Sequence, residues 1–535
     1  MIFAALSIAV LVVMVYQSVI NRPFYEANPQ LTLVGYDRVF ADPDFLLALV
    51  NSNIVALLTL LAIPIGLYAA VVLQKLDVPL IRRVLEPLIF SSMFVSPILW
   101  GFGWLYMYGP GGFAPRLWGD LYGIVPVGII SALIHVPYVY VLVSTGLLSI
   151  DSSYENAARA QGAGPLRTTL KITLPLIRPA IFFSTVVLYI LGIEQFGIPI
   201  VLLSPTSRNV LTTYIYQITT RSVNPDLSQV AVVASTMVYL SITLLLVQRY
   251  LSLRWVRRYA VVSGRTRGFS QIHVRWYVAL LLIAPIVAYL VVTILLPLVA
   301  IIFRSLYGSF GQASLEVYEF VLQQSYLKNA IVNTVLVALL SASMASAVYF
   351  AYGFIMVRGR SKAVAGLIDI ASTVPRAMPG LVAGLAFLWL FLFTPLRPIR
   401  YTLVGLAIAY VVLWSVLGTR IILTNLMQLS PELEEVGRAL GASNSTVLAR
   451  ITIPLLKRAI VIAWLIAFIY GVRDYQVAVF LSTVDTQVIG STIVHLFNSG
   501  DLGVIAALST ILLVITFAAS MVVVRLGWKP YGTQV

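Results

Sequence analysis

Long apolar segments recur along this chain, and each is close to the length that a helix needs to cross a bilayer, roughly 20 residues. Only 10% of the residues are charged and the mean hydropathy is +0.95, whereas a soluble domain carries about 25% charged residues. The expected spans are Ile2–Ile20, Phe45–Leu73, Leu88–Tyr108, Val125–Leu148, Ala180–Leu203, Leu227–Leu251, Trp276–Phe303, Ala330–Val357, Val364–Phe393, Leu403–Met427, Ala459–Leu481 and Gly503–Leu526. We therefore expect an all-α integral membrane protein with about twelve transmembrane helices.

The net charge of +15 indicates how these spans are oriented. If both ends of the chain lie in the cytoplasm, most Lys and Arg residues fall in the inside loops. Cytoplasmic loops of membrane proteins carry such an excess of Lys and Arg. We expect a multi-pass plasma-membrane protein with N and C termini in the cytoplasm. Attraction to anionic lipid is a second interpretation of the charge, and nucleic acid is not an expected partner.

Several chemistries are disfavoured by the residues present. The chain has no cysteine, and therefore no disulfide or thiolate metal site. Its histidines, at positions 135, 273 and 495, do not share helical spacing, so no metal site is expected. No Gly-Lys dipeptide occurs, which excludes a Gly-x4-Gly-Lys phosphate loop. No Lys or Arg precedes Arg22, so we expect the first span to be retained and not removed as a signal peptide.

An internal duplication organises the chain. Ala48–Asn51 and Val55–Leu58 recur in the second half, with the same spacing between them, as Ala330–Asn333 and Val337–Leu340. Six spans in each half is an even number, so the two halves share one orientation. We expect two parallel six-helix repeats related by a pseudo-two-fold axis along the membrane normal. The expected domains are a first half at 1–251, a basic linker at 252–275 and a second half at 276–535.

A polar element between apolar segments is also used twice. Tyr154–Pro175 recurs in the second half as Leu433–Pro454. In each copy nine residues separate a glycine, Gly162 or Gly441, from an Ile-x-[Leu/Ile]-Pro sequence. A polar element repeated inside a membrane protein favours a docking surface over a catalytic site. The alternative is a simple connector between spans.

The local signals in each copy predict two short helices around a glycine. In the first copy Ser152 is the expected N-cap, and Glu155 would complete a capping box. Gly162 suits the position just after a helix end, and Pro165 the first turn of the next helix. The second copy has the matching series Ser430 as cap, Pro431 at the first turn, Gly441 as stop, and Asn444 or Ser445 as the next cap. A connector has little reason to repeat these features.

The repeated element resembles the cytoplasmic signature Glu-Ala-Ala-x3-Gly-x9-Ile-x-Leu-Pro of the permease subunits of binding-protein-dependent ABC importers. The two copies read Asn156-Ala157-Ala158-x3-Gly162-x9-Ile172-x-Leu174-Pro175 and Glu435-Val436-Gly437-x3-Gly441-x9-Ile451-x-Ile453-Pro454. Asn156 replaces the glutamate in the first copy, and the second departs at Val436, Gly437 and Ile453. Two such permeases in one chain resemble the ferric-iron type, a subgroup that includes thiamine and phosphonate permeases.

That resemblance implies a function and partners. In the family this loop is a coupling helix that sits in a cleft of an ATPase subunit. Carried over, the residues contacting the two ATPase copies would be Glu155, Asn156, Ala157, Arg159 and Gly162 in the first half, and Glu434, Glu435, Arg438 and Gly441 in the second. The family implies a permease that is not itself an enzyme and holds no cofactor, two copies of a cytoplasmic ATPase that carries ATP and magnesium, and an extracytoplasmic solute-binding protein. The expected solute is ferric iron, with thiamine, a phosphonate or another oxyanion as alternatives.

Charged residues inside the expected spans are candidates for the translocation path, because such side chains are costly in a bilayer. The register of the polar repeat aligns Glu194 with Arg473 and Gln195 with Asp474. One hypothesis is that Glu194 and Arg473 pair across the halves and line or gate the path; the alternative is that each pairs locally or faces water. Arg376 lies in a proline-broken segment. It could meet an anionic substrate or reach towards the membrane surface.

Two other classes of function compete with the importer permease. A twelve-span ion-coupled secondary transporter is also a parallel duplication, but it needs no repeated protrusion, and co-purification of an ATPase would separate the two. An integral-membrane enzyme would need a cluster of nucleophile, base or metal ligands, and no such cluster is evident in the sequence.

Overall fold

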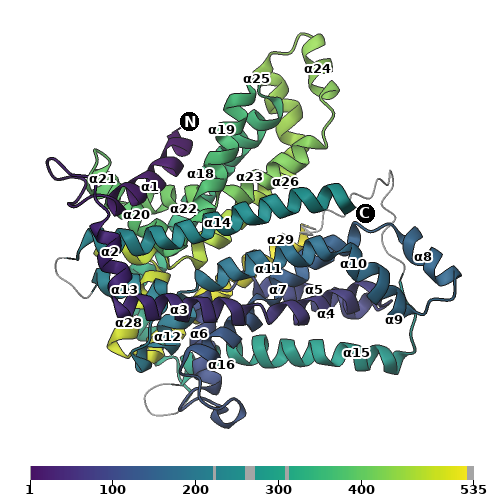
Figure 1. Cartoon of the computed structure of the whole chain (residues 1–535), viewed down its shortest axis with the longest axis horizontal. Helices are drawn as coiled ribbons and strands as arrows, with labels where there is room; N and C mark the ends of the chain where they lie inside the picture. Colours follow the sequence, from purple (N-terminus) through teal and green to yellow (C-terminus); the bar gives the residue numbers. More distant parts are fainter. Residues whose placement is uncertain (1, 221–224, 260–270, 308–312, 527–535) are drawn as a thin grey trace. The chain divides into compact units, whose positions relative to one another are not determined.

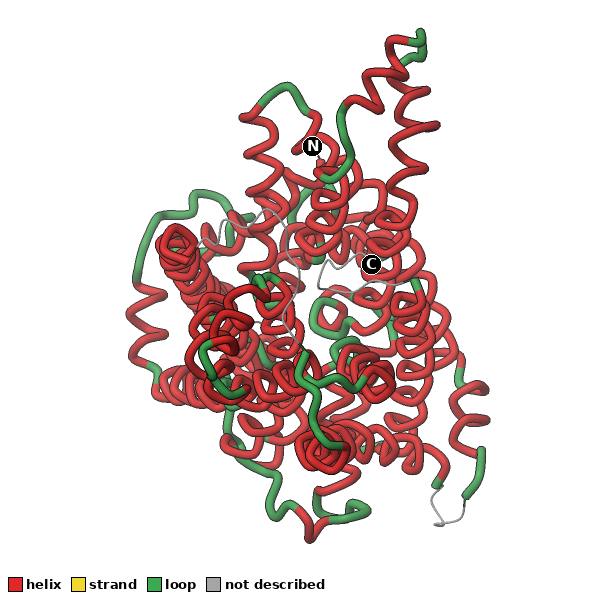
Figure 2. Tube along the Cα trace, turned by 90° about the vertical axis from the view of Figure 1, so that its right-hand side faces the viewer, coloured by secondary structure: helices red, strands yellow, loops and turns green. Residues whose placement is uncertain are grey.

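The structure, a computed structural model, describes residues 2–220, 225–259, 271–307 and 313–526. Within these ranges the regular elements are helices, and only isolated β-bridges such as Leu76 with Ile272 occur besides them (Figure 2). A backbone inside a bilayer must satisfy its own hydrogen bonds, which helices do within each segment. The expected all-α fold is confirmed.

Two compact units divide the chain. Unit 1 comprises Met1–Val39, Asn224–Val238 and Ser305–Trp528, and unit 2 comprises Phe40–Val223, Tyr239–Arg304 and Lys529–Val535. Helix α14 (Leu227–Tyr259) contributes to both units, and α2 (Val34–Ala41) and α16 (Leu296–Leu306) cross from one to the other at their ends. Each unit is described by itself below.

Unit 2 contains most of the helices of the first sequence half (Figure 1). Its elements are α3 (Pro43–Thr59), α4 (Ala62–Lys75), α5 (Pro79–Ser92), α6 (Pro97–Tyr108), η1 (Pro115–Leu117), α7 (Ile124–Leu148), α8 (Ser152–Ala160), α9 (Pro165–Thr168), η2 (Thr169–Thr173), α10 (Leu174–Leu176), α11 (Arg178–Ile193), α12 (Gly197–Leu202), η3 (Ser204–Thr206), α13 (Leu211–Thr220), α15 (Trp276–Tyr289) and η4 (Leu290–Leu295). Helix α7 packs against α3, α4 and α11 at the centre of this unit.

Unit 1 contains most of the helices of the second sequence half. Its elements are α1 (Ile2–Ser18), α17 (Glu316–Gln323), α18 (Ser325–Arg358), α19 (Lys362–Thr373), η5 (Val374–Ala377), α20 (Gly380–Leu392), α21 (Arg397–Arg400), α22 (Leu403–Leu413), α23 (Ser415–Met427), α24 (Glu432–Ala439), α25 (Asn444–Val447), η6 (Leu448–Thr452), α26 (Ile453–Arg473), α27 (Ala478–Leu481), η7 (Val484–Thr486), α28 (Ile489–Ser499) and α29 (Leu502–Arg525). Here α18 packs against α22, α23 and α26.

The first helix of each sequence half packs with helices of the other half. Helix α1 packs against α19, α20 and α22, which come from the second half. Conversely, α15 packs against α4, and η4 against α5 and α7 of the first half. A packing unit and a sequence repeat need not share boundaries, so the expected halves at 1–251 and 276–535 stay a prediction. Residues 260–270 of the expected linker at 252–275 lie outside the described residues.

Apart from Ile2–Ile20, the expected membrane spans correspond to long helices or to bent helix pairs. Among the described residues, seven helices are long and apolar enough to cross a membrane, and up to eleven do so if each bent pair is one span. Helix α1, at 17 residues, is a shorter apolar helix. The interruption expected within Val364–Phe393 is a bend of 112° between Lys362–Ala377 and Gly380–Leu392.

A second bend occupies the corresponding place in the first half. Pro79–Ser92 and Pro97–Tyr108 meet at 107°. Pro97 begins α6, and Pro379, its counterpart in the duplication, is the N-cap of α20. Proline cannot donate the backbone hydrogen bond that would continue the preceding helix, so the same residue type breaks the same span twice.

Small residues bring equivalent helices together in both halves. A Cβ atom added at Gly192 in α11 would lie 2.6 Å from the Cα of Ala56 in α3. The equivalent glycine in α26, Gly471, would place its Cβ 2.9 Å from the Ser341 Oγ and 3.2 Å from the Cα of Ala338 in α18. Membrane helices gain packing contacts where small residues let their backbones approach. This repeated contact supports the expected duplication at the level of side-chain packing.

Candidate functional site

The repeated polar element forms a similar loop in each half. The first repeat loop (residues 151–175) contains α8, α9 and η2, and the second repeat loop (residues 430–454) contains α24, α25 and η6. Figure 1 shows α8 and α9 beyond the ends of α4 and α7 in unit 2, and α24 beyond the ends of α23 and α26 in unit 1. Both loops thus project from the ends of long apolar helices.

Each loop turns at a glycine, as the sequence predicts. Gly162 has a φ angle of +81° and Gly441 of +87°, the left-handed region that glycine adopts without steric cost. The amide of Ala163 donates to the carbonyl of Ala158 at 3.0 Å, and Ala442 donates to Gly437 at 3.1 Å. This backbone pattern closes a helix C-terminus. Pro165 begins α9, so that prediction is also confirmed.

The expected helix caps are displaced by one or two residues. Asp151, not Ser152, caps α8, and its carboxylate accepts from the amide of Ser153. Asp and Ser are comparably good caps, so adjacent candidates are hard to separate by sequence. Pro431 occupies the N-cap position of α24, and Ser443 caps α25 in place of Asn444 or Ser445. Because Glu155 points into the protein, the expected capping box does not form.

Glu155 is held inside unit 2 by a basic residue and two threonines. Its side chain is 0% exposed, and the Lys75 Nζ lies 2.7 Å from its Oε1. Lys75, the last residue of α4, also donates to the hydroxyls of Thr173 at 2.7 Å and Thr169 at 3.2 Å. The Thr173 hydroxyl in turn donates to Glu155. We call these four residues the first anchor; they fasten α8 and η2 to the end of α4.

The second repeat loop is held by an equivalent group in unit 1. Arg358, the last residue of α18, places its Nε 3.3 Å from the Oε2 of Glu434. The Thr452 hydroxyl donates to Glu434 at 3.2 Å, and the Arg358 Nη2 donates to the carbonyl of Leu429 at 2.9 Å. Arg358, Glu434 and Thr452 form the second anchor. The register that aligns Gly162 with Gly441 also aligns Glu155 with Glu434 and Thr173 with Thr452.

In each anchor the threonine that donates to the glutamate, Thr173 or Thr452, ends a short π-helical segment. The segments are η2 (Thr169–Thr173) and η6 (Leu448–Thr452), which occupy equivalent places in the two copies. A π-helical turn has one extra residue, and such turns are frequent at functional sites. Here the π-helical turn ends at the threonine whose hydroxyl donates to the buried glutamate.

The remaining residues expected to contact an ATPase are distributed over the outer side of the loops. Asn156, Ala157 and Gly162 are exposed in the first loop, whereas Arg159 is half-buried. The second loop exposes Glu435, Arg438 and Gly441. These residues stay predicted contacts. Glu155 and Glu434 instead have their carboxylates paired within the chain.

Exposed apolar side chains on the second loop were not anticipated from the sequence. Leu433, Val436 and Leu440 are 48%, 58% and 84% exposed. The equivalent of Leu433 in the first loop, Tyr154, is 44% exposed. Leu433 and Val436 lie in α24 and Leu440 is its C-cap residue, and their spacings of three and four residues place the three side chains along one helix face. An i, i+3, i+7 apolar pattern in an otherwise acidic helix is the signal that could have identified them.

The candidates for the translocation path lie in different units. Glu194 is the C-cap residue of α11 in unit 2 and is buried, as is Gln195. In unit 1 the guanidinium of Arg473 lies 4.6 Å from the ring centre of Tyr470. The pairing of Glu194 with Arg473 stays a prediction.

Asp474 and Arg376 both lie in unit 1. The buried Asp474 accepts from the amides of Val477 and Ala478, both at 3.2 Å, and so holds the start of α27. Arg376 is half-buried within η5, at the bend between α19 and α20. Among the described residues, no group of three or more His, Asp or Glu is placed to hold a metal ion.

Long apolar helices, proline-broken spans and a twice-used anchored loop define a multi-span helical membrane protein built by duplication. The family model for the binding-protein-dependent transport system inner membrane component matches residues 62–258 and 349–527. These two matches cover more than half of the chain, and each includes one repeat loop. The chain belongs to this family of ABC importer permeases, which confirms the resemblance carried by the repeated motif.

Individual relatives come from several transport systems. Over 425 residues the chain is 27% identical to the ferric transport system permease protein FbpB of Actinobacillus pleuropneumoniae, covering 76% of this chain and 59% of that protein. It is 27% identical over 395 residues to the putative ferric transport system permease protein FbpB 1 of Haemophilus influenzae, covering 70% and 59%. The molybdenum transport system permease protein ModB of Escherichia coli is 26% identical over 172 residues, 31% of this chain and 75% of ModB. The chain spans about three fifths of the length of the two ferric relatives.

Proposed function

We propose that this chain forms the membrane path of an ABC importer and receives the work of ATP hydrolysis through its two repeat loops. The observation that carries this proposal is the repetition of the anchor: a buried glutamate, Glu155 or Glu434, fixes the loop in each half. A passive connector does not require a buried ion pair, because two charges lose their hydration to form it. Such a device is suited to a loop that must transmit force without changing its own shape.

In this proposal the anchors shape the loops and the exposed residues contact the ATPase. The first loop would present Asn156 and Gly162 together with the half-buried Arg159, and the second would present Glu435 and Arg438. The exposed Leu440, with its neighbours Leu433 and Val436, would enter an apolar depression of the ATPase subunit. Buried apolar anchors surrounded by polar residues dominate the binding energy of many interfaces.

The remaining parts of the importer are separate proteins in this proposal. Two copies of a cytoplasmic ATPase would carry ATP and magnesium, and an extracytoplasmic protein would deliver the solute. The chain would lie in the plasma membrane with both termini in the cytoplasm. Closure of the two ATPase subunits would move the repeat loops together and expose the path to the outside, which is alternating access.

Ferric iron is the solute that we propose. Its support is the naming of two relatives as ferric transport system permeases. Glu194, Gln195, Arg376, Arg473 and Asp474 are the proposed path residues, because charged and amide side chains within apolar helices mark substrate pathways in membrane proteins.

Reconstitution into liposomes tests the proposal. The chain is inserted with its ATPase and solute-binding protein, and uptake of radioactive ferric iron is measured with ATP, without ATP, and with a proton or sodium gradient alone. We expect uptake to require ATP together with both partners. Uptake by the isolated chain under an ion gradient would contradict the proposal and identify an ion-coupled secondary transporter instead. ATP-dependent uptake of thiamine or an oxyanion, but not of ferric iron, would contradict only the proposed solute and would leave the proposed importer function in place.

A further inference from the structure

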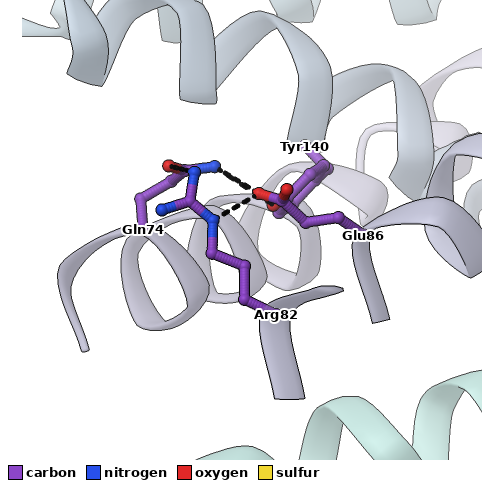
Figure 3. Close-up of polar contacts among 4 residues, drawn as sticks. All are labelled: Gln74, Arg82, Glu86 and Tyr140. Carbon is purple, nitrogen blue, oxygen red and sulfur yellow. Dashed lines mark hydrogen bonds and ion pairs between the residues drawn. The ribbon is translucent and has the colours of Figure 1, made fainter. Parts of the chain in front are cut away.

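One carboxylate oxygen in unit 2 joins three helices near the first anchor (Figure 3). The Oε1 atom of Glu86 in α5 accepts hydrogen bonds from the Gln74 Nε2 of α4 at 2.8 Å and the Tyr140 hydroxyl of α7 at 2.8 Å. It also accepts from the Arg82 Nε of α5 at 2.9 Å. The Arg82 Nη2 then donates to the Gln74 Oε1 at 2.6 Å, which closes the group into a ring.

The position of this group connects the first repeat loop with the bent helix pair. Gln74 and Tyr140 are both fully buried. Gln74 precedes Lys75, the residue that fastens α8 through Glu155. Tyr140 lies on α7, the helix that leads into the same loop. Glu86 lies on α5, the first arm of the pair that bends by 107° at Pro97. Two short, hydrogen-bonded routes therefore connect the first repeat loop with α5.

The second half joins the same elements with different residues. Asp369 lies on α19, the first arm of the pair that bends by 112°. Its carboxylate pairs with the Arg420 Nη2 of α23, the helix that leads into the second repeat loop. In the duplication, Asp369 and Arg420 lie next to the counterparts of Glu86 and Tyr140. Both halves thus tie a carboxylate on the bent arm to the helix that enters the repeat loop.

We propose that Glu86 and Asp369 are positioning residues that carry the movement of each repeat loop to the bent helix pair of its half. This inference rests on the proposed function, because an ATPase must move the loops. The bent pair is the element suited to respond, since a helix broken at proline changes direction there without losing further backbone hydrogen bonds. In the first half the side chains of Glu86 and Arg82 are 19% and 25% exposed, whereas those of Asp369 and Arg420 are 45% and 42% exposed. The first-half link should be the stiffer of the two.

Spin labels can follow this link in the complete complex, because the native chain has no cysteine. Cysteines replace Val84 in α5 and Leu170 in the first repeat loop, both exposed positions in unit 2. The distance between the two labels is measured in the complex with its ATPase, with and without ATP. In the native background we expect one distance in both states, since loop and arm move as one body.

The variants Tyr140→Phe and Glu86→Gln break the link and should separate the two movements. We expect the label distance with ATP to differ from that without ATP by about 2 Å or more, the scale of helix shifts in switching proteins. Tyr138→Phe removes a hydroxyl from the same helix outside the group and should leave the native behaviour. If Glu86→Gln does not assemble, Tyr140→Phe, which deletes one oxygen atom, decides the outcome.

Three results would overturn the inference. The native label distance could itself change with ATP, the variants could behave like the native chain, or they could broaden the distance distribution equally in both states, which indicates a purely structural role. Failure of the proposed function is distinguishable, because the native chain would then not bind an ATPase at all. A parallel label pair at Ile370 and Ala449, both exposed, with Asp369→Asn applies the same test to the second half.

Discussion

At the scale of single residues, the attachment of each repeat loop depends on one ion pair, the pair in its anchor. Glu155 is completely buried, so the energy of its charge depends on Lys75 and the threonines around it. The mutual attraction of a buried pair offsets the loss of hydration only while both partners are present. Glu434 has a longer contact with a partly exposed Arg358, and therefore depends less on its partner.

Removing one member of the first anchor should destabilise the chain more than removing both. Glu155→Leu leaves the Lys75 ammonium buried and unpaired, and we expect a cost of about 3–5 kcal/mol. The double variant Lys75→Met/Glu155→Leu should recover most of this loss. Thermal unfolding of the purified chain, followed by fluorescence, measures both effects. Glu435→Gln, at an exposed position of the other loop, is the control and should stay within about 0.5 kcal/mol of the native chain.

A glycine-to-alanine change at each loop turn tests the backbone geometry of these sites. Gly162→Ala and Gly441→Ala force a side chain into the left-handed region, which should cost about 1 kcal/mol or more. No atom of the surrounding structure lies within 4 Å of the added Cβ in either case, so the penalty comes from the local backbone and not from neighbouring elements. Similar losses in thermal unfolding are expected at both sites. Unchanged stability would show that each loop can adopt a different backbone conformation at this position.

At the scale of helices, the close contact of α11 with α3, repeated by α26 with α18, fixes the core of each half. Gly192→Val would place side-chain atoms against the α3 backbone at Ala56, and we expect a loss of about 1–3 kcal/mol. Gly366→Ala is the matched control on α19, where an added Cβ meets nothing within 4 Å and helix propensity improves by about 1 kcal/mol. The two changes should shift the unfolding temperature in opposite directions. A neutral Gly192→Val would mean that these helices can separate without cost.

The helices could be predicted from sequence more completely than the contacts between them. Apolar length alone identifies the spans, because only a helix satisfies a membrane-embedded backbone within one segment. The partners Lys75 and Glu155 are 80 residues apart, and no local pattern links them. Their signal was the duplication itself, because Glu155 and Thr173 recur as Glu434 and Thr452, and a basic residue ends the corresponding span in each half.

At the scale of the whole molecule, association with the ATPase should depend on the apolar face of the second loop. Leu440→Asp places a charge at its most exposed apolar position, where the proposed interface would bury it. We expect the ATPase to co-purify at least tenfold less, corresponding to about 1.4 kcal/mol or more. The fold should be unaffected, since the side chain contacts water in the isolated chain. Val484→Asp, another exposed apolar position outside the repeat loops, is the control, and equal loss in both would contradict a specific interface.

Helix α1 has a consequence for how this protein is made. It ends at Ser18, yet it packs against α19, α20 and α22, which are synthesised much later; α20 begins only at Gly380. At about 5–20 residues per second, the ribosome needs roughly 20–70 s to supply these neighbours. During that interval α1 lacks its contacts with these three helices. Maturation of unit 1 therefore cannot precede synthesis of the second half, and a chain truncated before α19 leaves α1 without these contacts.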